Sequence, residues 1–277
     1  MKSTEKNRDK ENKDRKKILI TNDDGFDSPA LLALIEAVEP LADIITVAPS
    51  LEKSACGHSL TLTKPLRFVK VKKTPYKNFY RLDDGTPTDC VFLALHKLYP
   101  VDAQPDLVIS GINIGANMGE DITYSGTASG AMEAVLQGVP AIAISQDFGD
   151  NFKAKALWDY GLAKETIQRL VTKIFEGEFP LTPRKFLNLN IPALSPRDSK
   201  GIKITKTGSR VYSNDADAHT NPRGEEYFWI GLVNHEWRET TGEMSDVEAV
   251  KNGYISITPI HLDMTAHNEI ERLKSWI

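Results

Sequence analysis

The chain has 277 residues, of which 40% are hydrophobic and 26% are charged, and its formal net charge is −4. This composition is typical of a globular protein with a sizeable core. The negative net charge gives no general attraction to nucleic acid, and no apolar run is long enough to span a membrane. We therefore expect neither nucleic acid nor a membrane as a partner.

The N-terminal segment differs in composition from the rest of the chain. Lys2 to Lys17 hold eight basic and four acidic side chains, and no apolar residue follows Met1 in this stretch. Such a segment cannot bury an apolar face, so we expect residues 1–16 to be a disordered, charged tail. The mixed signs disfavour the alternative of a nucleic-acid-binding arm. The tail lacks the apolar part of a signal peptide, which predicts a cytoplasmic protein with Cys56 and Cys90 as reduced thiols.

The stretch Ile18-Leu-Ile-Thr-Asn-Asp-Asp-Gly25 predicts both a strand and a candidate site. Its short apolar run is typical of a buried strand in a parallel sheet, and Asp23 and Asp24 follow at the carboxyl end, where ligands bind. Adjacent carboxylates repel each other, and a hard divalent cation would make the pair favourable. The alternative is a solvated turn, because Asn, Asp and Gly are all turn residues.

Predicted helices and strands alternate along most of the remaining chain, which indicates an α/β fold with right-handed βαβ connections. Antiparallel strands are expected within 60–71 and at 79–82, on one side of the sheet. The other expected strands are 43–47, 106–113, 140–145 and 186–191, and the expected helices are 30–38, 87–98, 131–137 and 154–175.

The alternation stops near residue 200, and strand-like stretches at 226–232 and 253–258 follow among polar loops. We expect residues from about 200 to 277 to form an antiparallel arm. Such an arm is marginal on its own, so it should pack on the domain or on another subunit.

Polar side chains also follow the second and third strands, so they should lie beside Asp23 and Asp24. In the segment 50–59, the Ser54 hydroxyl is a possible metal ligand, although its spacing favours a turn cap. His58 alone favours a hydrogen-bonded structural histidine over a catalyst. Asn113 brings an amide oxygen to the same edge.

A glycine-rich segment, Tyr124-Ser-Gly-Thr-Ala-Ser-Gly130, leads directly into the helix expected at 131–137. Backbone N–H groups and hydroxyls at the N-terminus of a helix form an anion site, so this loop predicts phosphate binding. It is not a Walker A loop, because the Gly-Lys-Ser/Thr ending is absent. The alternative is a flexible loop with a Ser/Thr cap.

Six motifs, in order from about residue 17 to the C-terminus, resemble the SurE family of survival-protein nucleotidases. Only the charged tail departs from the family pattern. The motifs are Ile20-Thr-Asn-Asp-Asp-Gly25, Ala48-Pro49 with Lys53-Ser-Ala55 and Gly57-His-Ser59, Gly85-Thr-Pro-Thr-Asp-Cys90, Ser110-Gly-Ile-Asn113, Tyr124-Ser-Gly-Thr127 and Gly253-Tyr-Ile-Ser-Ile-Thr-Pro259.

The resemblance implies a single domain over residues 17–277, with a Rossmann-like doubly wound core and a C-terminal arm that assembles dimers or tetramers. It implies a metal-dependent 5′-nucleotidase that hydrolyses nucleoside 5′- and 3′-monophosphates and some short polyphosphate, with one Mg²⁺ or Mn²⁺ per subunit. Its metal site maps onto Asp23, Asp24, Ser54 and Asn113, and its phosphate-contacting loop maps onto Ser125, Gly126 and Thr127. Asp23 or Asp24 is the expected catalytic general base.

Two other functions share part of this pattern. A signalling receiver module also places paired acidic residues after its first strand, but the strand ending at Ser110-Gly111 carries no phosphoacceptor aspartate at its tip. A nucleotide-binding protein without turnover is the second alternative.

Overall fold

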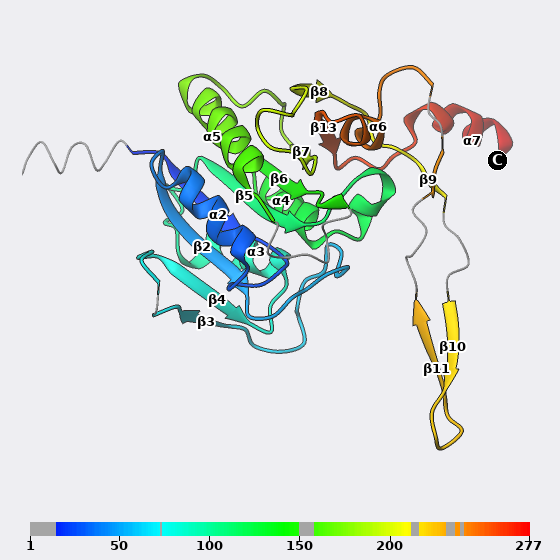
Figure 1. The fold of residues 1–277 in the computed structure, drawn as a ribbon, viewed down its shortest axis with the longest axis horizontal. Helices are drawn as coiled ribbons and strands as arrows, with labels where there is room; N and C mark the ends of the chain where they lie inside the picture. Colours follow the sequence, from blue (N-terminus) through cyan, green and yellow to red (C-terminus); the bar gives the residue numbers. More distant parts are fainter. Residues whose placement is uncertain (1–14, 73, 150–157, 212–215, 231–235, 239–240) are drawn as a thin grey trace, which may run out of the picture.

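The computed structural model describes residues 15–72, 74–149, 158–211, 216–230, 236–238 and 241–277 (Figure 1). The tail expected at 1–16 therefore lies almost wholly outside the described residues. Its last two residues contact the body of the protein, since Arg15 pairs with Asp43 at 3.5 Å and Lys16 with Asp106 at 2.9 Å. In the described part of the chain no helix is both long and apolar enough to cross a bilayer.

A nine-stranded sheet in the order β3-β4-β2-β1-β5-β6-β7-β13-β8 forms the centre of the protein. Its middle strands are parallel, which confirms the α/β prediction. These strands are β2 (Asp43–Pro49), β1 (Lys17–Thr21), β5 (Leu107–Ile114), β6 (Ala141–Gln146) and β7 (Lys185–Ile191). At one edge β3 (Arg67–Lys70) pairs antiparallel with β4 (Phe79–Asp83), and at the other β13 (Ile255–His261) pairs antiparallel with β7 and parallel with β8 (Ile202–Ile204).

Helices cover both faces of this sheet, as expected for a doubly wound fold. Side chains of α2 (Pro29–Val38) and α5 (Gly161–Glu176) form one core, and those of α3 (Pro87–Lys97) and α4 (Gly126–Leu136) form the other. Ile18 and Ile20 belong to the first core and Leu19 to the second, because successive side chains of a strand point to opposite faces. The continuous apolar run of β1 thus follows from burial on both faces.

The strand order reverses at β1, because β2 lies on one side of it and β5 on the other. In open α/β sheets the crevice at such a point, outside the carboxyl ends of the strands, binds ligands. Asp23 and Asp24 follow β1, and Asn113 lies at the end of β5. The topology therefore brings together the carboxylates and the amide that the sequence analysis identified.

The antiparallel pair at 60–71 and 79–82 is formed only in part, since its first strand is restricted to Arg67–Lys70. The residues before it are held by α3 instead of by a strand ladder. Thr61 donates its backbone N–H and its hydroxyl to Asp89, at 2.8 and 2.6 Å, and Thr86 donates its hydroxyl to the Ser59 carbonyl at 2.8 Å. Side-chain hydrogen bonds of this kind compete with strand pairing.

Two helix starts differ from the prediction. Helix α4 begins at Gly126, so most of the segment expected as a glycine-rich loop forms its first turns. Helix α5 begins at Gly161 instead of residue 154, and 154–157 lie outside the described residues. Residues 158–160 precede the helix, and there Trp158 stacks on Phe148 with ring centroids 4.6 Å apart.

The C-terminal region divides between the central sheet and a projecting hairpin (Figure 1). Antiparallel strands β10 (Ala216–Thr220) and β11 (Glu226–Ile230) form the hairpin, which confirms an antiparallel element in the expected arm. The strand expected at 253–258 lies in the central sheet as β13. The remaining elements are β9 (Arg210–Val211), β12 (Glu236–Trp237), α6 (Asp246–Lys251), α7 (Ile270–Trp276), and the 3-10 helices η1 (Gly119–Thr123) and η4 (His267–Glu269).

Asp89 supplies a test of how α3 holds the segment before β3. Its buried carboxylate accepts from the Thr86 N–H, completing a capping box, and from both donors of Thr61. We expect Asp89→Ala to lower the free energy of unfolding by about 2–3 kcal/mol, because three donors lose their acceptor. Urea denaturation measures this change. The exposed Asp102→Ala is the control and should stay within about 0.5 kcal/mol of the parent; equal midpoints for all three proteins would contradict the assignment.

Candidate active site

A tight turn after β1 positions the paired aspartates. The buried Asn22 donates its amide to the Gly25 carbonyl at 2.9 Å, and Gly25 has φ +102°, a conformation that strongly favours glycine. The Lys53 N–H donates to the Asp23 carbonyl at 2.7 Å, which holds the loop after β2 against the turn. The segment that carries Ser54 is therefore next to Asp23, as predicted from the strand order.

Asp23 is buried, and its carboxylate is held by the first turn of α4. Thr127 donates its backbone N–H to Asp23 Oδ2 at 3.1 Å and its hydroxyl to Asp23 Oδ1. At Gly126 an added Cβ would lie 2.8 Å from the Asp23 Cβ and 3.1 Å from the Cys56 Sγ. Glycine at position 126 therefore allows α4 to approach Asp23, a reason that the sequence analysis did not identify.

Asp24 is partly buried and connects the end of β1 to the end of β5. Its Oδ2 accepts a hydrogen bond from the Ile114 N–H at 3.1 Å. The neighbouring Asn113 donates its amide nitrogen to the Gly115 carbonyl at 2.7 Å, so the amide oxygen is the atom it offers to a cation. The pairing of β5 with β6 shifts register between Ser110 and Asn113, and irregularities of this kind re-aim side chains next to active sites.

Ser54 is exposed, and its hydroxyl donates to Glu52 Oε1 at 2.6 Å. Glu52 itself is close enough for its charge to raise the pKa of both Asp23 and Asp24. Glu52 was not among the site residues expected from the sequence. An isolated acidic residue in a polar loop carries no signal of its own, and its position depends on the contact between Lys53 and Asp23.

The two aspartates hold protons more tightly than ordinary carboxyls. Burial is the main cause for both: it raises the pKa of Asp23, and together with the charge of Asp23 it raises the pKa of Asp24 to about 7. A carboxylate pair of this kind is costly when ionised without a counter-charge, and a cation reverses the preference.

The donor set fits a hard divalent cation. Asp23, Asp24, Ser54 and Asn113 all offer oxygen atoms, which Mg²⁺ and Mn²⁺ prefer. Within the described residues no group of three or more His, Cys, Asp and Glu side chains is arranged for a metal ion. Hydroxyl and amide oxygens would therefore have to complete the coordination that the two carboxylates begin.

The N-terminus of α4 contacts the carboxylate of Asp23. Ser125 is its N-cap and accepts from the Ala128 N–H at 3.0 Å, and both donors of Thr127 are directed to Asp23. The observed contacts of these two side chains are thus within the protein, and their contact with phosphate stays a prediction, as does that of Gly126. The helix N-terminus nevertheless lies where a phosphate beside the aspartates would meet its positive dipole.

His58 contacts a buried carboxylate instead of the aspartates. Its Nε2 lies 2.9 Å from Glu133 Oε2 on α4, and Gln137 donates to the other oxygen of Glu133 at 2.8 Å. Burial raises the pKa of Glu133, but the hydrogen bonds from His58 and Gln137 outweigh it and hold the pKa below its usual range. This contact agrees with the prediction of a structural histidine, and it holds the Ser54 loop against α4.

Comparison with known proteins agrees with the family resemblance seen in the sequence motifs. The family model described as survival protein SurE matches residues 18–214. The 5′-nucleotidase SurE of Sulfurovum sp. (strain NBC37-1) is 59% identical over 263 residues, covering 95% of this chain and 98% of that protein. The 5′-nucleotidase SurE of Aliarcobacter butzleri (strain RM4018) is 56% identical, with coverage of 95% and 99%. The crystal structure of the SurE protein from Aquifex aeolicus matches with a TM-score of 0.77 at 39% identity, covering 94% of this chain and 99% of that one.

The raised pKa of Asp24 predicts how pH affects the metal-free protein. Between the ordinary value of 3.8 and about 7, the folded protein holds a proton that the unfolded chain has lost, so stability falls as pH rises through this window. In excess chelator we expect a higher melting temperature at about pH 5 than at about pH 8. Asp24→Asn should reduce this difference and be the more stable protein at the higher pH.

The exposed neighbour Asp27 supplies the matched control, because Asp27→Asn removes a charge from the same turn. It should keep the pH dependence of the parent. An Asp24→Asn variant whose melting temperature changes with pH as much as that of the parent would show that this carboxylate is not the group responsible.

Proposed function

The chain belongs to the SurE family and is a 5′-nucleotidase, and we propose that it uses one divalent metal ion per subunit, Mg²⁺ or Mn²⁺, at Asp23 and Asp24. We extend the proposal to nucleoside 3′-monophosphates and short polyphosphate, in which a terminal phosphate is attached to a different chemical group. One observation supports it most: two adjacent carboxylates with raised pKa values lie where the strand order reverses, facing a helix N-terminus.

Asp23, Asp24, Ser54 and Asn113 would hold the ion, which when bound supplies positive charge against the phosphoryl oxygens. Ser125, Gly126 and Thr127 would place the phosphate at the α4 N-terminus, where the helix dipole favours negative charge. In-line attack by water then needs a nearby group to accept a proton.

Between the two aspartates, Asp24 is the better candidate for the general base. Asp23 is buried and accepts two hydrogen bonds from Thr127, which hold it in place. Asp24 is partly exposed, and the hydrogen bond from Ile114 engages its Oδ2, so Oδ1 would be the oxygen that accepts from a water molecule. We therefore assign positioning to Asp23 and proton transfer to Asp24.

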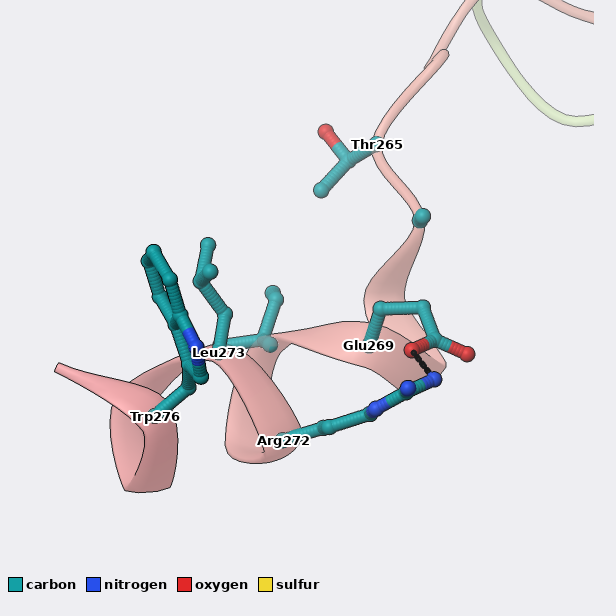
Figure 2. A pocket seen from close by; sticks show the side chains of 7 residues that line it. Thr265, Glu269, Arg272, Leu273 and Trp276 are labelled. Carbon is teal, nitrogen blue, oxygen red and sulfur yellow. Dashed lines mark hydrogen bonds and ion pairs between the residues drawn. The ribbon is translucent and has the colours of Figure 1, made fainter.

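We also propose a cytoplasmic homo-oligomer, a dimer or a tetramer, assembled through the C-terminal region. Tyr227, Phe228, Trp229 and Ile230 are consecutive on β11 and are all exposed, by 50%, 67%, 70% and 85%. A second apolar surface lies on α7, where Leu273 and Trp276 lie on one side of the helix (Figure 2). Exposed apolar patches of this kind mark interaction sites.

The metal proposal is tested by Asp23→Asn and Asp24→Asn, which keep the side-chain shape and remove one negative charge each. We expect AMP hydrolysis with Mn²⁺ to fall roughly a hundredfold or more in each, with weaker metal binding. Asp27→Asn serves as the control in the same turn. Full activity in either variant, or an unaltered rate of the parent in excess chelator, would refute the site.

The oligomer proposal is tested by replacing residues 216–230 with a short Gly-Ser linker. Truncation before residue 200 would be a poor test, because it removes β8 and β13 from the central sheet. We expect light scattering to give a smaller assembly than that of the parent. Leu62→Glu, which changes an apolar residue 86% exposed elsewhere on the surface, is the control. A deletion variant that assembles like the parent would show that the hairpin is not the interface.

A further inference from the structure

A cavity of about 550 Å³ adjoins the site, and the chemistry proposed above does not use it. Its lining includes Asn113 and Ile114, and the Ile114 N–H donates to Asp24. The cavity therefore begins at the end of β5, at the residues that contact or neighbour the paired aspartates. Its size lies within the range of about 300–1,000 Å³ that small-molecule sites occupy.

The floor of this cavity is apolar and contains one aromatic ring. Met118, Val247 and Val250 are buried, and the partly buried Trp237 packs against them. Asp121, Asp147 and Lys251 add charged groups to the lining. An apolar, aromatic floor with a few polar groups at its edge is the usual composition of a site for an amphipathic organic ligand.

Several contacts fix Trp237 in the floor of the cavity. Its strand β12 pairs with β9, and the Arg238 N–H donates to the Ser209 carbonyl at 2.9 Å. A Cβ at Gly119 would lie 2.6 Å from Trp237 Cζ3, so the absence of a side chain there lets the ring lie against the backbone of η1. The indole is thus held by its surroundings before any ligand binds.

Asp246 holds together, by hydrogen bonds, three segments that form the floor of the cavity. Its buried carboxylate accepts from the backbone N–H groups of Gly119 and Gly208, both at 2.8 Å, and of Val247 at 2.9 Å. These residues belong to η1, to the segment before β9 and to α6, which are distant in sequence. A cavity floor held in this way is preformed, which lowers the entropy cost of ordering its side chains when a ligand binds.

We propose that this cavity holds the nucleoside part of the substrate, with the base stacked against Trp237. The inference rests on the proposed function: Ile114, which donates to Asp24, also lines the cavity, so a phosphate held at Asp24 would have the cavity next to its organic group. Stacking on an aromatic side chain contributes about 1–3 kcal/mol per base and accepts any base, because every base has a π-face. Trp237 would therefore increase affinity for nucleotides over phosphate esters that lack a base.

The test compares AMP with ribose 5-phosphate, which presents the same phosphate and sugar without the base. In Trp237→Ala we expect the ratio of kcat/KM for AMP to that for ribose 5-phosphate to fall about tenfold, mainly through KM. Trp237→Phe, which keeps a smaller aromatic face, should restore most of the ratio. Leu62→Ala is the control, because Leu62 is 86% exposed and lies outside the cavity lining.

A second measurement separates this inference from the nucleotidase proposal. Isothermal titration of adenosine in excess chelator needs neither the metal nor catalysis, and we expect Trp237→Ala to weaken adenosine binding about tenfold. If Trp237→Ala fails to fold, Ala116→Trp, which fills the cavity from its lining, should cause the same losses. Circular dichroism checks the fold of each variant.

The two measurements together separate a failure of the cavity assignment from a failure of the nucleotidase proposal. An unchanged substrate ratio together with unchanged adenosine binding overturns the cavity assignment and leaves the nucleotidase proposal intact. A parent protein that releases no phosphate from either substrate, but binds adenosine in a Trp237-dependent way, overturns the proposed function and supports the cavity. A lower ratio through KM with weaker adenosine binding supports both.

Discussion

The contact between Asp23 and Thr127 is the interaction on which the site depends. A buried carboxylate at the end of β1 accepts both donors of the first turn of α4, and Gly126 makes the approach possible. This contact sets the distance between the sheet edge and the helix N-terminus. The proposed metal ligands lie on one side of this contact and the proposed phosphate-binding end of α4 lies on the other, so a change at either side would alter both.

The burial of the two aspartates has an energetic consequence. Burial raises the pKa of Asp23 and of Asp24, and the charge of Asp23 adds to the rise at Asp24, so the metal-free protein is less stable at neutral pH than its packing alone would allow. Natural proteins accept such local costs at functional sites. A cation bound at the proposed site would remove the repulsion, so ion binding would be thermodynamically linked to the stability of the fold.

Residues at the end of β5 belong both to the candidate metal site and to the cavity that contains Trp237. Ile114 donates its N–H to Asp24, the neighbouring Asn113 is a proposed metal ligand, and both residues line the cavity that contains Trp237. A substrate with a phosphate and an attached base would contact both the site and the cavity across these two residues. Asp246 holds the floor of that cavity by accepting from three backbone N–H groups. The C-terminal region therefore contributes to the cavity as well as to the central sheet.

Local pattern alone determined much of this protein: the parallel strands and their flanking helices follow from apolar periodicity, and Asp23, Asp24 and Asn113 follow from strand ends. Tertiary contacts decided the rest. The segment at 60–66 alternates like a strand, yet Asp89 holds it by side-chain hydrogen bonds. Glu52, the packing role of Gly126 and the position of Trp237 depend on partners many residues away. Periodicity reports which face of an element is buried, whereas it carries no information about which distant atoms meet there.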